Sequence, residues 1–224
     1  VLQSPEFTLK TDTLRYNTLT KIAYSFGPTE IINKEGAIIY ADGGEFRTEI
    51  SQTEISSGNI ETSEYILDGD KLFFDDFNQY YLGEGNVKLT SKENNLILLG
   101  DEGYHDKVNG YSKIYGNAIM KKIMKLDTFY IAADTMMAIE SEYDSIRRIL
   151  AYPDIRIFKM NVQGIADSSA YLLADSIIML YQNPVLWTGE NQVLSDTIAI
   201  HLNDSSIEKM DLKRNAFLIT QDSV

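Results

Sequence analysis

Apolar side chains recur at every second position along much of this chain, and this period constrains its fold more than any other feature. The pattern is clear over 21–26, 86–90 and 197–202, where large apolar residues alternate with polar or small ones. Successive side chains of a β-strand point to opposite faces, so a period of two predicts strands with one face out of water. Segments 96–99 and 176–181 are almost wholly apolar, which is typical of strands covered on both faces.

Turn-forming residues separate the predicted strands at short intervals. Gly, Asn, Asp and Ser gather at 42–44, 68–70, 93–95, 109–110 and 203–205. These residues favour tight turns, and the chain has only four prolines to interrupt strand pairing. The sequence therefore predicts an all-β, antiparallel fold in which hairpin follows hairpin.

One stretch fits a helix as well as a hairpin. Ile139, Tyr143 and Ile146 stand at i, i+4 and i+7, the spacing of one helix face. A helix over about 137–150 is therefore an alternative to a hairpin with its turn at 142–145. We favour the hairpin, because the segments on both sides are predicted to be strands.

Two short phrases repeat along the chain. Gly-Asn-apolar begins at Gly58, Gly85 and Gly116, at intervals of 27 and 31 residues. Asp followed by Ser or Thr and then an apolar residue begins at Asp12, Asp127, Asp134, Asp144, Asp175 and Asp196. Gly permits a bend or bulge, and Asp with Ser or Thr can satisfy backbone donors where the chain turns. A unit of about 30 residues holds roughly four strands, so the repetition predicts stacked hairpin layers, with chance recurrence as the alternative.

Composition and motifs exclude several classes of function. The formal charge of −13 and the pI near 4.5 argue against nucleic acid as a partner. No apolar run approaches the ~18 residues of a membrane-spanning helix, and no signal-peptide pattern opens the sequence. The absence of cysteine excludes thiol catalysis and thiolate metal sites. His105 and His201 have no second metal ligand at helical spacing, so we predict neither a metal nor a cofactor.

Paired carboxylates are the nearest approach to a catalytic motif. They occur at 75–76 and 101–102. A glycosidase needs two carboxylates facing one another across a cleft, whereas neighbours on a strand point to opposite faces. We therefore predict no enzyme activity.

Several phrases in the second half of the chain resemble one protein family. The segments 133–136, 164–168 and 174–177, with Pro-Val-Leu-Trp at 184–187 and Asn-Gln at 191–192, resemble the OstA-like proteins, relatives of the lipopolysaccharide transport (Lpt) proteins of the bacterial envelope. The resemblance is greatest to the longer OstA-like proteins of Bacteroidetes-type bacteria. It implies that 8–224 form a single elongated β domain of a longer protein, and we expect 1–7 to be an added or disordered segment.

This resemblance implies a β-jelly roll, in which two antiparallel sheets face one another like a half-closed taco around an apolar trough. The implied role is to shield the acyl chains of lipopolysaccharide, or a related amphiphile, in the periplasm. The implied partners are other OstA-like or Lpt domains, or copies of the same chain, stacked end to end through edge strands. An acyl chain of about a dozen methylenes costs ~10 kcal/mol to expose to water, so a carrier needs an apolar trough of matching length.

Candidate lipid contacts follow from this picture and from the alternation. The expected trough-lining residues are apolar strand positions assigned to the inner face: Ile22, Tyr24, Phe26, Val87, Leu89, Leu98, Ile114, Ala118, Met120, Ile157 and Trp187. Basic residues are expected to form a headgroup rim, or else a solvated strand edge that opposes aggregation; they are Lys121, Lys122, Lys125, Arg147 and Arg148.

Two other functions fit the same strand pattern. A structural or adhesive β-repeat protein, binding protein or glycan, would have a filled core in place of a trough. A carbohydrate-active enzyme on a β-helix would need the acidic pairs to converge. The resemblance ranks the carrier first and the enzyme last.

Overall fold

The regular structure of the chain consists of β-strands that pair antiparallel. The computed structural model describes residues 1–3, 7–34, 36–139 and 147–220, and those residues contain no helix that could cross a membrane. The strands in chain order are β1 (Leu2–Gln3), β2 (Phe7–Thr11), β3 (Leu14–Asn17), β4 (Ile22–Asn33), β5 (Ile38–Arg47), β6 (Gln52–Glu61), β7 (Tyr65–Asp75), β8 (Tyr80–Ser91), β9 (Leu96–Asp106), β10 (Tyr111–Ile123), β11 (Thr128–Ile139), β12 (Arg148–Tyr152), β13 (Ile155–Lys159), β14 (Val162–Ala166), β15 (Ser168–Leu172), β16 (Ile177–Tyr181), β17 (Val185–Thr188), β18 (Asn191–Leu194), β19 (Thr197–Leu202), β20 (Ile207–Lys213) and β21 (Phe217–Ile219). The predicted all-β antiparallel fold is confirmed.

The chain divides into two compact units. Unit 1 consists of Val1–Asn94 and Leu99–Asn109, and unit 2 consists of Asn95–Leu98 and Gly110–Val224. Strand β9 contributes residues to each unit.

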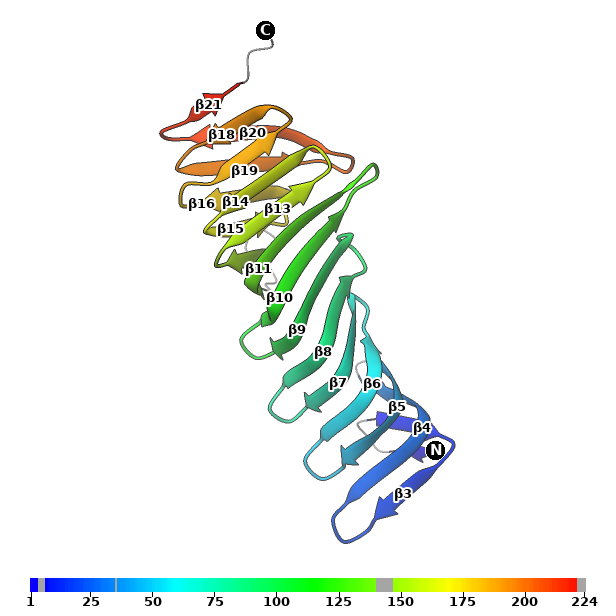
Figure 1. Cartoon of the computed structure of the whole chain (residues 1–224). Helices are drawn as coiled ribbons and strands as arrows, with labels where there is room; N and C mark the ends of the chain where they lie inside the picture. The colour runs from blue at the N-terminus through cyan, green and yellow to red at the C-terminus, as the bar shows by residue number, and fades with distance from the viewer. Residues whose placement is uncertain (4–6, 35, 140–146, 221–224) are drawn as a thin grey trace. The chain divides into compact units, whose positions relative to one another are not determined.

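The long strands of unit 1 run from one sheet into the other. Strand β4 pairs with β3 through residues 22–25 and with β2 through residues 29–33. Between these two parts, its register with β5 shifts at a bulge after Phe26. Figure 1 shows β4 to β8 as long, curved, neighbouring strands. We call the line of bulges and crossovers between the sheets the spine, and the opposite side, formed by hairpin turns, the mouth.

The two sheets of unit 1 pack face to face. One core cluster takes Ala23 and Phe46 from the first sheet and Leu9 and Ile31 from the second. Its full membership is Leu9, Ala23, Ile31, Ile39, Ala41, Phe46, Ile55, Ile60, Leu72 and Phe74, all at most 9% exposed. Leu2, from the segment expected to lie outside the fold, packs against this cluster and pairs with Leu9.

Unit 2 separates into two sheets at β11. Residues 135–139 of this strand pair with β12, and residues 130–132 pair with β13. From there the pairing continues as two series, β12–β15–β16–β19–β20 and β13–β14–β17–β18–β21. The chain alternates between the series and crosses the spine after every hairpin. This is the predicted arrangement of two facing sheets built from hairpin layers.

Two of the three Gly-Asn repeats form bulges. At the first, Gly58 and Asn59 stay in register with Gly69 and Asp68, and the residue with positive φ is Ser57. Gly85 and Asn86 have φ angles of 71° and 50°, and Gly116 and Asn117 have φ angles of 70° and 53°. Register shifts in the β7–β8 and β10–β11 pairs fall at these residues. The left-handed backbone favours Gly and Asn over other residues, which explains the dipeptide at these two bulges.

Several Asp-Ser/Thr phrases also lie on the spine. Asp134 lies between the two halves of β11, and Asp196 occupies the crossover between β18 and β19. The Asp196 carboxylate accepts hydrogen bonds at 3.0 and 3.1 Å from Asn215 Nδ2, in the next crossover. In contrast, Asp127 and Asp175 lie in hairpin turns at the mouth, and Asp144 lies outside the described residues.

The ambiguous stretch at 137–150 is flanked by paired strands. Ile139, at the end of β11, is in register with Arg148, at the start of β12. The helix alternative is therefore wrong for residues 137–139 and 148–150. The predicted turn at 142–145 lies outside the described residues.

Candidate functional site

Most of the predicted lining residues face the space between two sheets. Six of them are at most 3% exposed: Val87, Leu98, Ile114, Ala118, Met120 and Ile157. Leu89 is half-buried and lies opposite Leu67, which packs on the unit 1 core. These seven residues have the inward orientation that the alternation predicts.

Four predicted lining residues lie on the outer faces. Ile22, Tyr24 and Phe26 alternate with Ala23 and Ser25, which are 0% and 5% exposed and point inward. Phe26 is 55% exposed. The alternation was assigned to the wrong face here: the inward positions are the neighbouring Ala23 and Ser25. Small side chains occupy the inner face near the spine, and the large apolar ones face outward.

Trp187, in unit 2, also faces outward where the sequence predicted that it faces inward. Its neighbour Leu186 is fully buried, whereas Trp187 is 39% exposed and stands opposite Gln163 on the outer face. Adjacent strand residues point to opposite faces, so Leu186, and not Trp187, lies between the sheets.

The space between the sheets of unit 1 is filled where the core cluster lies. Its members bury one another almost completely, and Phe7, Leu14 and Tyr81 pack around them. The inner faces are therefore in mutual contact there and do not line an empty channel.

A hollow of about 330 Å³ opens at the mouth of unit 1. Four aromatic residues, Phe7, Phe46, Phe77 and Tyr81, belong to its lining. The remaining lining comes mainly from strand ends and hairpin turns: Asn33, Lys34, Arg47, Thr48, Ser51, Gln52, Thr53, Asp76, Gln79 and Lys107. The hollow thus combines aromatic surface with a polar rim, which suits an amphiphilic ligand.

Asp75, from the first acidic pair, has a structural role beside this hollow. It is 1% exposed and accepts hydrogen bonds from Gln52 Nε2 at 2.8 Å and from the backbone and side chain of Asn78 at 2.8 and 2.9 Å. Burial raises the pKa of Asp75, but the hydrogen bonds from Asn78 and Gln52 outweigh this effect and lower the pKa below its ordinary value. The carboxylate therefore holds the β7–β8 turn.

A buried cation lies at the mouth of unit 2. Lys159 follows Ile155 and Ile157 on the inner face of β13, and its side chain is 8% exposed. Its Nζ lies 3.2 Å from Asp127 Oδ2 and donates to Asn161 Oδ1 at 3.1 Å. Sequence analysis missed this lysine, although its phase relative to the two isoleucines was a usable signal.

The lysines predicted for the rim differ in orientation. Lys122 shares the inner face with Met120 and stands opposite the buried Phe129, and burial lowers its pKa while Asp204 opposes that shift. Lys121 points outward, with Nζ 6.0 Å from the centre of the Tyr130 ring. Only Lys122 therefore approaches the interior from β10.

The other rim candidates occupy the edges of the mouth. Lys125 is exposed in the β10–β11 turn, with Nζ 3.7 Å from Asp204. Arg147 and Arg148 lie at the opposite end of β11, where Arg148 is in register with Ile139. Because β11 passes from one sheet to the other between these groups, the lysines and the arginines border the mouth on different sheets.

Each histidine contacts a side chain of a neighbouring strand. His201 Nε2 lies 2.8 Å from Asp211 Oδ2, and the His105 ring stacks on Tyr81 at 5.5 Å. Among the described residues, no group of three or more His, Asp or Glu side chains could hold a metal ion.

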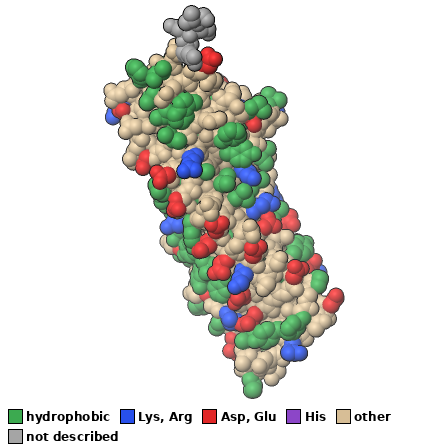
Figure 2. All heavy atoms as spheres, viewed as in Figure 1, with side chains coloured by type: hydrophobic (Ala, Val, Ile, Leu, Met, Phe, Trp, Pro, Cys, Tyr) green, Lys and Arg blue, Asp and Glu red, His purple; other side chains and the backbone are tan. Residues whose placement is uncertain are grey.

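Apolar residues are exposed along the last strand of one sheet series. Strand β21 pairs with β18, and its residues Phe217, Leu218 and Ile219 are 62%, 58% and 46% exposed. Figure 2 shows hydrophobic side chains over the region of β18, β20 and β21. An exposed apolar edge strand is a surface on which a further strand can pair.

Comparisons with known proteins give likenesses to solved structures but none to a family model or a curated protein. The chain is similar to the crystal structure of LptH from Pseudomonas aeruginosa, described as the LptA homologous periplasmic component of the conserved lipopolysaccharide transport device. Identity is 12%, the match covers 70% of this chain and 95% of that chain, and the TM-score is 0.35. The fold assignment rests on the strand pairing and not on this likeness.

Proposed function

We propose that this chain is an amphiphile-binding module that holds acyl chains, such as those of lipopolysaccharide, between its facing sheets. The observation that carries the proposal is the geometry of each unit: two sheets with apolar inner faces, joined along the spine, with hairpin turns along the mouth. A lipid can enter such a structure from the side, with its headgroup left at the mouth. No catalytic step is required.

The packed interior makes lipid entry an exchange of apolar contacts. Side chains such as Ile55 and Leu72 must separate from their partners on the other sheet before a chain can lie between them. Each buried CH₂ of the entering chain contributes ~0.8 kcal/mol, which offsets the loss. The half-buried Leu89 and the hollow at the mouth of unit 1 mark where entry is easiest.

Basic residues at the mouth of unit 2 supply contacts for an anionic headgroup. Lys122 lies beside Phe129 in β11, and the register of β11 with β13 places Lys159 on the far side of the same ring. Arg148 borders the mouth on the other sheet. Ammonium and guanidinium groups bind phosphate through charge-assisted hydrogen bonds, so they favour a phosphorylated headgroup.

Further layers of strands extend the apolar interior in this proposal. The exposed β21 and its neighbour series offer unpaired edges, and β3 and β1 are the outer strands of unit 1. Strand addition by another OstA-like or Lpt domain, or by a second copy of this chain, would cover these edges. A module of this kind would act in the periplasm.

Photo-crosslinking tests the proposal through paired positions in one strand. A photoreactive residue at Leu89 faces inward, and one at Lys88 faces outward as the matched control. With purified lipopolysaccharide, we expect adducts at Leu89 and none at Lys88. Adducts at neither position, or equal adducts at both, would exclude binding between the sheets.

A structural scaffold is the second candidate, and the filled core of unit 1 favours it. Core residues at most 9% exposed need no ligand to remain out of water. Native mass spectrometry of the purified chain separates the candidates. A carrier retains bound amphiphile, whereas a scaffold has the mass of the bare chain and leaves Leu89 without adducts.

A further inference from the structure

Aromatic and amide side chains alternate in one row across the outer face of a sheet in unit 2. Phe158 of β13 is in register with Gln163 of β14, Gln163 with Trp187 of β17, and Trp187 with Gln192 of β18. Leu186, next to Trp187, is fully buried between the sheets, and residues directly opposite one another on paired strands share a face. We call these four residues the outer row, because all of them point away from the interior.

Both aromatic rings of the outer row are open to solvent. Phe158 is 52% exposed and Trp187 is 39% exposed. The Phe158 ring also packs against Tyr130 of β11, with ring centres 6.1 Å apart. Aromatic rings held on paired strands offer flat apolar surfaces in fixed positions, and exposed apolar surface of this kind marks a binding site.

The polar groups of the outer row are not satisfied within the protein. The side-chain amides of Gln163 and Gln192 have no hydrogen-bond partner among the described residues, and neither has the Trp187 indole N–H. An amide side chain both donates and accepts hydrogen bonds, whereas the indole N–H only donates. The row therefore suits a ligand that combines apolar faces with hydroxyl groups.

The spacing of the two rings indicates a polymer with a regular repeat. Neighbouring strands lie about 4.8 Å apart, and Phe158 and Trp187 stand two strands apart in the row. In an extended β1,4-linked glycan, each pyranose ring advances the chain by about the distance between neighbouring strands. Alternate sugar rings can therefore lie over Phe158 and Trp187, with the intervening ring over Gln163.

Charge favours an uncharged glycan. No residue of the outer row is charged, and the net charge of −13 repels polyanions. A hollow of about 330 Å³ adjoins Phe158, and Arg156 belongs to its lining. Arg156 has no ion-pair or hydrogen-bond partner in the described part of the chain, so its guanidinium can donate to a sugar hydroxyl beside the row.

We propose that the outer row binds a neutral, linear, β1,4-linked glycan in its extended conformation. The C–H faces of alternate sugar rings stack on Phe158 and Trp187, and the amides of Gln163 and Gln192 exchange hydrogen bonds with the hydroxyl groups. A sugar hydroxyl is both donor and acceptor, so it satisfies either end of an amide. This assignment does not depend on whether lipid enters between the sheets.

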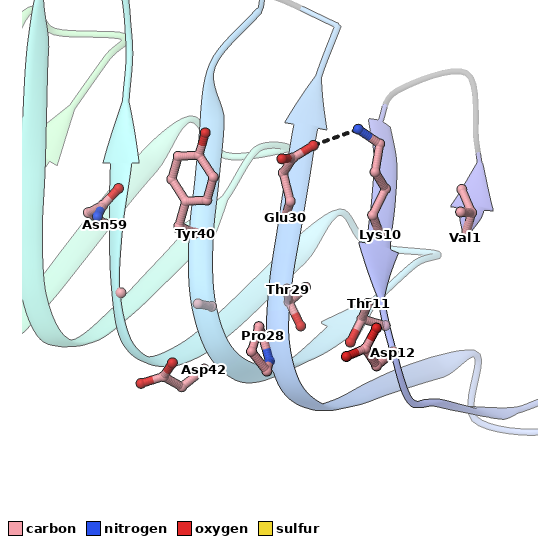
Figure 3. Close-up of a pocket in the computed structure, with 12 residues that line it drawn as sticks. Val1, Lys10, Thr11, Asp12, Pro28, Thr29, Glu30, Tyr40, Asp42 and Asn59 are labelled. Atoms are coloured by element: carbon pink, nitrogen blue, oxygen red, sulfur yellow. Dashed lines mark hydrogen bonds and ion pairs between the residues drawn. The ribbon is translucent and has the colours of Figure 1, made fainter.

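The outer face of unit 1 supplies a matched control. The Tyr40 ring lines another hollow and stands between Glu30 and Asn59 in a row of its own (Figure 3). Tyr40 is 41% exposed, close to the exposure of the tryptophan. The residues two strands away in its row are Lys10 and Asp68, so this face has one exposed ring without a second at the glycan spacing.

Oligosaccharides of increasing length test the assignment. The probes are cello-oligosaccharides and N-acetylglucosamine oligomers of two to six rings, with maltohexaose, whose α-linked chain curves, as the comparison. Trp187 is the only tryptophan, so its fluorescence reports stacking at the row. At least three rings are needed to reach from Phe158 to Trp187. We therefore expect the hexamer of one series to bind with a Kd of about 1 mM, and its dimer and maltohexaose to bind at least about tenfold more weakly.

Variants of the whole chain locate the site, with ligand-observed NMR as a readout that does not need the tryptophan. Phe158→Ala and Trp187→Ala should each weaken hexamer binding about tenfold and remove the gain from dimer to hexamer, whereas Tyr40→Ala should leave both unchanged. The proposal is overturned if dimer and hexamer bind equally, if maltohexaose binds as tightly as the extended hexamer, or if Tyr40→Ala weakens binding as much as Trp187→Ala. Absence of binding by both extended series would also overturn it and would favour a protein partner for this face.

Discussion

The buried ion pair at the mouth of unit 2 gives the sharpest test of the described packing. The perturbation is Asp127→Ala. It leaves the Lys159 ammonium, in a side chain only 8% exposed, with Asn161 Oδ1 as its remaining polar neighbour. It also removes the acceptor for the backbone N–H groups of Thr128 and Met160, at 2.7 and 3.1 Å. Leaving a buried charge unpaired costs about 3–5 kcal/mol, so we expect Asp127→Ala to lower the free energy of unfolding by that amount.

The two partners should respond unequally. Lys159→Met replaces the buried ammonium by an apolar side chain of similar length, and Asp127, 20% exposed, keeps its two backbone donors. We expect this variant to lose about 1 kcal/mol or less. The double variant should be more stable than Asp127→Ala by about 2 kcal/mol, since no buried charge remains unpaired.

Urea unfolding followed by tryptophan fluorescence measures these differences. Trp187 is the only tryptophan and belongs to unit 2, so its signal reports the unit that contains the pair. Asp204→Ala is the matched control, because its ion pair with Lys125 is 88% and 72% exposed and should contribute less than about 0.5 kcal/mol. Equal losses in both single variants, or no recovery in the double variant, would refute burial of the lysine as the dominant effect.

The pair also predicts a pH dependence. The hydrogen bond from the Thr128 backbone, opposed by burial, and then those from Met160 and Lys159 lower the pKa of Asp127 below its ordinary value. A lowered carboxyl pKa adds stability above the ordinary value, and that stability is lost as the pH falls through the folded-state pKa. The difference between wild type and Asp127→Ala should therefore be constant near neutral pH and shrink below about pH 4.

Two further predictions concern glycine and asparagine positions. Gly164→Ala should lower the free energy of unfolding by about 1–3 kcal/mol in the same urea assay. The added Cβ would overlap the Leu186 side chain and approach Val185 O to 3.0 Å. An unchanged urea midpoint would contradict the close approach of β14 and β17. Asn86→Val should lower the free energy of unfolding by about 1–3 kcal/mol, because φ is 50° at this position and the hydrogen bond to Asp70 is lost. Asn86→Gly loses the same hydrogen bond but accepts this φ, so thermal unfolding should show a smaller loss of stability for it.

The strand pattern could be predicted from the sequence, but the phase of some strands could not. In β4 both faces carry apolar residues, so Ile22 and Tyr24 are as plausible inside as Ala23. On the outer face, the Arg15 guanidinium lies over the Phe26 ring, 5.5 Å from its centre, and covers part of it. Such a contact comes from a neighbouring strand, and single-strand periodicity contains no information about it.

Two of the three Gly-Asn phrases predicted bends correctly, but the sequence did not predict the strand pairing around them. Gly85 and Gly116 begin bulges, as their conformational freedom suggests. Within unit 2, that the Gly116 bulge and crossovers such as the one at Asp196 lie between the same two sheets depends on pairing between distant strands. The inward orientation of Lys159 follows from its phase relative to Ile155 and Ile157, but its pairing with Asp127, 32 positions earlier, depends on contact between distant parts of the chain.

Whether a lipid can enter the packed interior depends on how much apolar area is exposed when the sheets separate. At ~25 cal/mol per Å², exposing about 400 Å² costs ~10 kcal/mol, similar to what burial of a dozen methylenes returns at ~0.8 kcal/mol each. Lipid entry is thus an exchange near balance, and the bulges and crossovers of the spine restrict where it can begin. Crosslinking by a carrier should therefore decline from Leu89, nearer the mouth, to Val87, beside the bulge in the same strand, whereas adducts that are strongest at Val87 would contradict entry from the mouth.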